Sequence, residues 1–155
     1  MTVSHWSFEG SVRQGELVVH ADVADDIVQV FRALFDARFP IERMELVDVY
    51  GGDDTRSMDA NNTSAFNCRP ATGSSRWSEH AYGRAIDINP VQNPYVPHRG
   101  PVQPSAGSAF VDRSPSVGVI TADGPVVGAF AAIGWEWGGS WSSAKDYQHF
   151  SESGR

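Results

Sequence analysis

The stretch SEHAYGRAID, residues 78–87, contains two side chains that could share chemistry, His80 and Asp87. Asp87 lies in the segment 84–89, RAIDIN, which predicts a strand with its isoleucines on one face and its aspartate on the other. Gly83 lies between the two side chains and permits a backbone conformation that other residues avoid, so a turn there could bring them together. By spacing alone, such a pair is more often a hydrogen bond or a surface coincidence than a metal site.

A second candidate pair occurs near the end of the chain, in DYQHF, where Asp146 precedes His149 by three residues. A histidine in such a pair can bind a metal while the carboxylate takes a proton from metal-bound water. In a flat strand, however, residues three apart point to opposite faces. Both reach one site only if the chain turns or bulges near Asp146 or begins there as a helix. The alternative is an exposed loop acid followed by a half-buried histidine in a final strand.

Taken together, the two segments supply the ligands of an open metal site. Two imidazoles, His80 and His149, and one carboxylate, Asp87, would leave a fourth position for water, which is the arrangement of catalytic zinc. Zinc lowers the pKa of such a water to about 7. Asp146 would then act as the base and later as the acid toward the leaving amine.

The two motifs, in this order, resemble a known peptidase family. The pattern S-x-H-x-x-G-x-A-x-D, followed far downstream by a carboxylate-x-x-His-Phe, is similar to that of the zinc D-alanyl-D-alanine carboxypeptidases, and the resemblance covers roughly residues 40–151. Relatives of that family include L-alanyl-D-glutamate peptidases of phage endolysins, lysostaphin-type enzymes and the Hedgehog signalling domain. The resemblance implies one zinc ion held by His80, Asp87 and His149, with Asp146 as the catalytic carboxylate.

The resemblance also suggests residues that contact the substrate. The family has an arginine upstream of the first motif, and Arg69 matches it in AFNCRPATGS. Its fixed guanidinium would polarise the scissile carbonyl and stabilise the oxyanion. Ser78, Tyr82 and Trp137 are further candidate substrate contacts. Many members have glutamate where this chain has Asp146, but the branch that it most resembles often has aspartate, so the site is not expected to be inactive.

The elements that must position these residues can be outlined from the hydrophobic pattern. Apolar residues recur at helical spacing from Val23 to Phe35, with Asp22 as a plausible cap and Pro40 as the stop. A second helix is expected over about 125–133, capped by Asp123 or Thr121 and ended by Gly134. Expected strands are 16–20, 43–50, 84–89 and a closing strand–turn–strand, and 51–76 and 90–117 are expected to be long loops. This order predicts an α+β fold of the Hedgehog and D,D-peptidase type, with a small, mainly antiparallel sheet, flanking helices and long loops.

Length and composition limit the remaining possibilities. A chain of 155 residues is expected to form one catalytic domain over 1–155. The net charge of −7 and the absence of a basic run disfavour binding to nucleic acid. The one cysteine, Cys68, excludes an intramolecular disulfide, and no apolar run is long enough to span a membrane. The N-terminal residues lack the features of a signal peptide, and therefore give no information on location. The family resemblance implies an extracellular or cell-envelope location in a bacterium. A monomer is expected.

Three functions from different classes fit these observations to different degrees. The first is a zinc peptidase that acts on peptidoglycan stem peptides by attack of zinc-bound water. It would act at D-Ala-D-Ala as a carboxypeptidase, or alternatively at L-Ala-D-Glu as an endopeptidase. The second is a zinc-containing module that binds the cell wall without catalysis, which the complete set of site residues argues against. The third is a metal-dependent nuclease, which the acidic charge disfavours.

Overall fold

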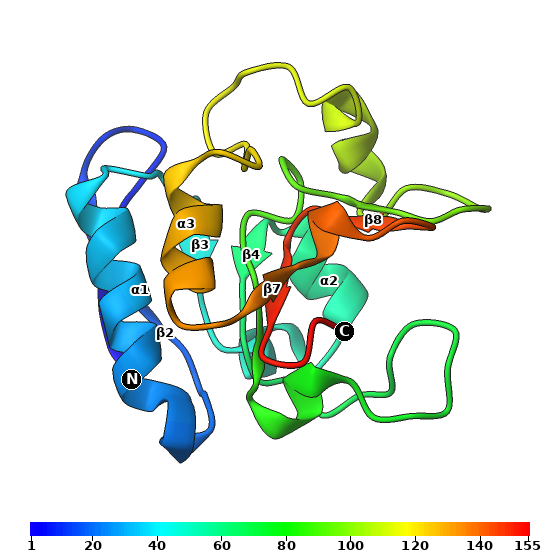
Figure 1. Cartoon of the computed structure of the whole chain (residues 1–155), viewed down its shortest axis with the longest axis horizontal. Coiled ribbons are helices and arrows are strands. Elements are labelled where there is room, and N and C mark those ends of the chain that lie inside the picture. Colours follow the sequence, from blue (N-terminus) through cyan, green and yellow to red (C-terminus); the bar gives the residue numbers. More distant parts are fainter.

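The computed structural model describes all residues, 1–155, and combines three α-helices with nine short strands (Figure 1). The helices are α1 (Ala24–Asp36), α2 (Asp54–Asp59) and α3 (Pro125–Ala132). The strands are β1 (Thr2–Trp6), β2 (Val12–Glu16), β3 (Arg43–Met44), β4 (Asn62–Thr63), β5 (Ala85–Asp87), β6 (Tyr95–Val96), β7 (Glu136–Trp137), β8 (Lys145–Asp146) and β9 (His149–Ser151). Short 3₁₀ helices span Ala21–Val23, Val47–Tyr50, Glu79–Tyr82, Ser105–Phe110 and Gly138–Ser140. The expected α+β class is confirmed.

The strands form several small sheets rather than one. β1 and β2 make an antiparallel hairpin, β5, β9 and β7 make an antiparallel sheet in that order, and β6 pairs with β8. Only β3 and β4 run parallel. The sheet structure is therefore mainly antiparallel, as predicted. None of the helices has the length and apolar character that a membrane span requires.

Helix α1 forms where the apolar spacing predicts it. Ile27, Val30, Phe31 and Leu34 are buried along one face, and this face packs beside α3 and β1 (Figure 1). The expected cap is wrong, because Val23 stands at the N-cap of α1 without a side-chain hydrogen bond, and His20 caps the short 3₁₀ turn that precedes the helix. The helix ends at Asp36, four residues before Pro40.

Helix α3 supports the sheet that carries the candidate site. Its Phe130 is fully buried and stacks on Phe150 of β9, with ring centroids 4.1 Å apart. Gly124 stands at the cap position, where Asp123 or Thr121 was expected, and Pro125 occupies the first turn as predicted. Since side chains alternate along a strand, burial of Phe150 against α3 turns the neighbouring His149 toward the opposite face.

The expected strands at 16–20 and 43–50 are wrong in extent. In place of a strand at 16–20, the structure has β2, which ends at Glu16. In the segment 43–50, only Arg43–Met44 forms a strand, and Val47–Tyr50 forms a 3₁₀ turn. Gly15 of β2 lies against β3, because a Cβ there would lie 2.4 Å from Met44 Cβ and 2.6 Å from its carbonyl oxygen. The hairpin therefore packs on β3 through a close backbone approach that apolar periodicity does not register.

The two expected loops contain regular structure. Residues 51–76 include α2 and β4, and residues 90–117 include β6 and the turn at Ser105–Phe110. Asp53 caps α2 by accepting from the Arg56 N–H. That cap, followed by an acid at Asp54, is a helix-start signal that short length and few apolar residues obscure.

Candidate metal centre

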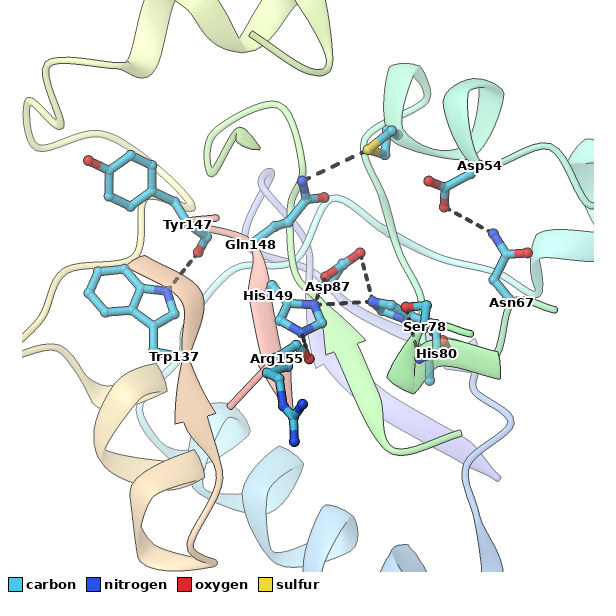
Figure 2. A network of polar contacts seen from close by, with 12 residues as sticks. Asp54, Asn67, Ser78, His80, Asp87, Trp137, Tyr147, Gln148, His149 and Arg155 are labelled. Atoms are coloured by element: carbon cyan, nitrogen blue, oxygen red, sulfur yellow. Dashed lines mark hydrogen bonds and ion pairs between the residues drawn. The ribbon is translucent and has the colours of Figure 1, made fainter. Parts of the chain in front are cut away.

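Asp87 and His149 meet because they stand opposite each other in the sheet. The register of the antiparallel pair β5 and β9 sets Asp87 directly across from His149, although they are 62 residues apart in the chain. Ile86 and Ile88 flank Asp87 and are fully buried in the core, so the aspartate points to the other face, as the alternation predicts. The Asp87 Oδ1 and His149 Nδ1 atoms lie 3.0 Å apart (Figure 2).

His80 reaches the same point from the 3₁₀ turn at Glu79–Tyr82, just before β5. Ser78 caps this turn, its Oγ accepting the His80 N–H at 3.3 Å. Gly83 ends it in the left-handed region at φ 65°, and a Cβ at this glycine would lie 2.7 Å from the backbone nitrogen of His20. Both the conformation and the close approach favour glycine, so the predicted turn at Gly83 is confirmed.

The three side chains form a cluster with the dimensions of a metal site. His80 Nε2 lies 3.1 Å from Asp87 Oδ2 and 3.2 Å from His149 Nδ1, and all three residues are buried. In a tetrahedral site with ligand atoms about 2.0 Å from zinc, neighbouring ligand atoms are about 3.3 Å apart. The observed separations are near that value, with His80 facing one oxygen of Asp87 and His149 facing the other. With one ligand atom from each residue, the three atoms lie within 4.8 Å of one another, and two imidazole nitrogens with one carboxylate oxygen form a donor set that zinc accepts.

The second nitrogen of each imidazole is held by a backbone carbonyl. His80 Nδ1 lies 2.6 Å from the oxygen of Ala65, and His149 Nε2 lies 3.0 Å from the oxygen of Arg155. Each of these nitrogens must donate, because a carbonyl oxygen only accepts. In the neutral rings the lone pairs then fall on His80 Nε2 and His149 Nδ1, the two atoms that face the cluster (Figure 2). Metal-binding histidines are commonly oriented in this way.

Electrostatics in the metal-free cluster favour an ion pair. Burial alone would raise the pKa of Asp87, but the charges and hydrogen bonds of His80 and His149 hold that pKa far below its ordinary value. Burial would lower the pKa of His149, but the hydrogen bond and charge of Asp87 raise it to about 9. A protonated His149 thus donates both N–H groups, one to Asp87 and one to the Arg155 carbonyl.

The chain bends between Asp146 and His149, which lie on two different strands. β8 pairs with β6 and β9 pairs with β5, and Tyr147 and Gln148 form the bend where the chain changes partner. This is the turn that the spacing of Asp146 and His149 requires. Gly138 leaves room for it, because a Cβ there would lie 2.9 Å from Asp146 Cβ and 2.7 Å from its carbonyl oxygen.

The Asp146 carboxyl lies in an environment that favours its neutral form. The residue is partly exposed, but its Oδ1 is enclosed and has no hydrogen-bond partner. Burial, together with the negative charge of Asp87 and against the positive charges of the two histidines, raises the pKa of Asp146 to about 7. A carboxyl with this pKa can both take and give a proton near neutral pH.

Arg69 lies on a segment that runs beside the His80 turn. Its carbonyl accepts the Ser78 N–H at 3.2 Å, and the N–H of Asn67 donates to the His80 carbonyl at 3.1 Å. The Arg69 side chain forms an ion pair with Asp54, with 2.9 Å between Nε and Oδ1. Sequence reasoning did not identify Asp54, because the helix that carries it was expected to be a loop.

The candidate substrate contacts have different surroundings. Ser78 is buried and caps the His80 turn, Tyr82 is 53% exposed, and Trp137 is partly buried with its Nε1 donating to the Tyr147 carbonyl (Figure 2). Trp137 also stacks on Phe150, so much of its surface belongs to the core. Contact of these three residues with a substrate stays a prediction.

Comparison with known proteins identifies the family. Residues 72–152, a little more than half of the chain, match the family model described as D-alanyl-D-alanine carboxypeptidase. The matched segment includes His80, Asp87, Asp146 and His149, whereas Arg69 precedes it. No curated protein and no solved structure matches the chain. The family match and the buried His-Asp-His cluster agree with the resemblance that the two motifs carry, and the chain therefore belongs to the D-alanyl-D-alanine carboxypeptidase family of peptidases.

Proposed function

We propose that this chain is a zinc-dependent peptidase that hydrolyses the stem peptides of bacterial peptidoglycan, as a D-alanyl-D-alanine carboxypeptidase. The observation that carries the proposal is the convergence of His80 Nε2, His149 Nδ1 and the two Asp87 carboxylate oxygens, with separations of 3.0–3.2 Å and with both imidazoles oriented by backbone oxygens. We further propose that residues 1–155 act as one catalytic domain, as a monomer, at the cell envelope. The family match supports the class of substrate.

His80, Asp87 and His149 would hold the zinc ion. When bound, the ion acidifies water and polarises the scissile carbonyl. The register of β5 and β9 places Asp87 beside His149, and the two side chains form an ion pair. Two of the three ligands are therefore held close together before a metal binds. Their burial excludes competing solvent from the ligand atoms.

Asp146 would move the proton. We infer that its carboxylate takes the proton of the attacking water and returns it to the leaving amine nitrogen as the amide C–N bond breaks. Its pKa of about 7 supports both roles, because at neutral pH the protonated and ionised forms coexist. Aspartate is one methylene shorter than the glutamate of many family members, so its carboxylate would have to come closer to the metal or act through a displaced water.

Arg69 would stabilise the negative charge that develops on the scissile carbonyl oxygen. Its position on the segment beside the His80 turn supports this role. Ser78, Tyr82 and Trp137 would contact the peptide, and Ser78 also caps the turn that carries His80.

Digestion of defined stem peptides tests the proposed function. A synthetic pentapeptide stem ending in D-Ala-D-Ala, and a stem with an intact L-Ala-D-Glu bond but no terminal D-Ala, are incubated with zinc-loaded and chelator-treated protein. Mass spectrometry should detect free D-alanine from the first peptide with the zinc-loaded protein only. Cleavage of L-Ala-D-Glu alone would assign the chain to the endopeptidases instead. Absence of any cleavage, with zinc bound, would contradict the proposal and favour a binding module.

A further inference from the structure

We propose that Asp54 is a positioning residue for the reaction, which acts by fixing the guanidinium of Arg69. This inference deepens the proposed function and rests on it, because it assigns a role to the partner of a residue that would act on the substrate. Asp54 lies at the start of α2, outside both sequence motifs and outside the segment that matches the family model.

One carboxylate oxygen joins two neighbours of the candidate site. Asp54 Oδ1 lies 2.9 Å from Arg69 Nε and accepts from Asn67 Nδ2 at 3.0 Å. The side chains of Arg69 and Asp54 are only 21% and 25% exposed, so solvent screens this pair less than it screens a surface ion pair. Arg69 Nε itself is enclosed, and its N–H is not aligned well enough for a hydrogen bond, so the contact is mainly one of charge.

One terminal nitrogen of the guanidinium has no partner. Arg69 Nη1 donates to the Pro70 carbonyl at 3.3 Å, whereas Nη2 has no hydrogen bond within the chain and is not among the enclosed atoms. Asp54 therefore holds the planar group at Nε and leaves Nη2 as a donor for a ligand. A guanidinium that is fixed at one nitrogen loses less conformational freedom when another nitrogen binds an oxyanion.

The same network connects Arg69 with the metal centre. Asn67 donates its side-chain amide to Asp54 (Figure 2). Its backbone N–H donates to the His80 carbonyl. The Arg69 carbonyl in turn accepts from the Ser78 N–H. Asp54 thus sets the guanidinium relative to the turn that presents His80.

A purely structural role in α2 does not account for this arrangement. Asp53 is the residue that caps the helix, through the Arg56 N–H at 3.1 Å, and Asp54 makes no cap contact. Asp53 is exposed, adjacent and equally charged, so it provides a matched control. In Asp54→Asn the amide oxygen would still accept from Asn67, and only the charge that faces Arg69 would be lost.

A double-mutant cycle tests the inference. Activity on the D-Ala-D-Ala peptide is measured for Asp54→Asn, Arg69→Ala, the double variant and Asp53→Asn, each with its zinc content. Arg69→Ala should lower kcat about 10²–10³-fold. Asp54→Asn should lower kcat about tenfold with zinc content unchanged. In the Arg69→Ala background, Asp54→Asn should change nothing further. Asp53→Asn should behave as the wild type.

An activity-independent measurement accompanies the cycle. The ¹⁵N–¹H resonance of Arg69 Nε, assigned by its loss in Arg69→Ala, should shift or broaden in Asp54→Asn and stay unchanged in Asp53→Asn. The inference would be overturned if the kcat of the double variant fell by the product of the two single-variant losses. It would also be overturned if the Arg69 Nε resonance were unchanged in Asp54→Asn. If the wild type cleaves neither stem peptide, the proposed function fails, and the resonance still decides whether Asp54 fixes Arg69.

Discussion

At the residue scale, the site combines three groups with opposite tendencies to hold protons. Asp87 is held ionised by the two histidines, His149 is held protonated by Asp87, and burial raises the pKa of Asp146 to about 7, where its neutral and ionised forms coexist. The first two are potential metal ligands, while the third has an enclosed oxygen without a partner. Ligand and base can therefore be separated by substitution.

We expect Asp146→Ala to abolish hydrolysis while zinc stays bound, because this variant removes the proton acceptor and leaves the ligands in place. His80→Ala and His149→Ala should lose both zinc and activity, since each removes one of three ligands. Metal content by atomic absorption and release of D-alanine are the measurements. Wild-type turnover in Asp146→Ala would contradict the assigned base, and full zinc occupancy in either histidine variant would contradict the ligand set.

Zinc affinity should depend on pH through His149. In the metal-free protein the pKa of His149 is raised to about 9, so below that pH zinc must displace a proton from Nδ1. The apparent affinity should rise about tenfold between pH 7.5 and 8.5. A competition titration against a chromophoric chelator measures this slope. The exposed His98 lies outside the cluster, so His98→Gln should leave the slope unchanged. An affinity that is flat over this interval would show that His149 is already neutral.

At the element scale, the site depends on the bend between β8 and β9, where the chain passes from a strand paired with β6 to one paired with β5. The bend at Tyr147–Gln148 separates Asp146 of β8 from His149 of β9, and the charges of Asp87 and the two histidines act on the Asp146 carboxyl. Arg113 reinforces the bend, with its guanidinium carbon 4.2 Å above the Tyr147 ring and with donors to the Gln92 and Ile120 carbonyls. The loop that carries Arg113 thus holds the segment between Asp146 and His149.

We expect Gly138→Ala to displace Asp146. An added Cβ would lie 2.7 Å from the Asp146 carbonyl oxygen and 2.9 Å from its Cβ, which backbone movement must relieve at about 1–3 kcal/mol. Turnover should fall while zinc content changes little. Gly128→Ala is the control, because no atom lies within 4 Å of its added Cβ, and in α3 it should stabilise by up to about 1 kcal/mol. Thermal unfolding and kcat measure both, and unchanged turnover in Gly138→Ala would contradict the assigned packing.

The sequence predicted the residues of the metal cluster better than the short elements that surround it. The alternation of Ile86, Asp87 and Ile88 and the glycine turn were readable, because each follows from local periodicity and backbone freedom. Helix α2 and the hairpin of β1 and β2 were missed, since they are short, polar and stabilised by distant contacts such as that of Gly15 with Met44. The ion pair of Asp54 with Arg69 depends on α2 and could not be inferred without it.

At the scale of the whole molecule, the buried polar residues of the candidate site lower the free energy of unfolding. The core formed by α1, α3 and the sheet stabilises the chain, whereas the site buries an aspartate and two histidines and encloses an oxygen of Asp146. Burial of charged groups costs free energy unless they are paired. A ligand that binds only the native state offsets this cost by mass action, so zinc should raise the thermal midpoint and a chelator should lower it.

The contribution of Asp146 to stability should have a definite sign in the metal-free protein. Its pKa is raised from 3.8 in the unfolded chain to about 7 in the fold, so between these values the native state holds a proton that the unfolded state has lost. Native stability attributable to this group therefore falls as pH rises from 4 to 7, and the deficit stays constant above 7.

Asp146→Asn removes that deficit because its side chain does not ionise. Since Asp146 is partly exposed, we expect the variant to gain roughly 1–3 kcal/mol over the wild type at pH 8 and nothing near pH 3.5. Urea unfolding at both pH values, with chelator present, measures the difference. Asp59→Asn, an exposed aspartate of α2, should show no such pH-dependent gain. An equal gain at both pH values would mean that packing and not the charge of Asp146 limits the stability of the metal-free fold.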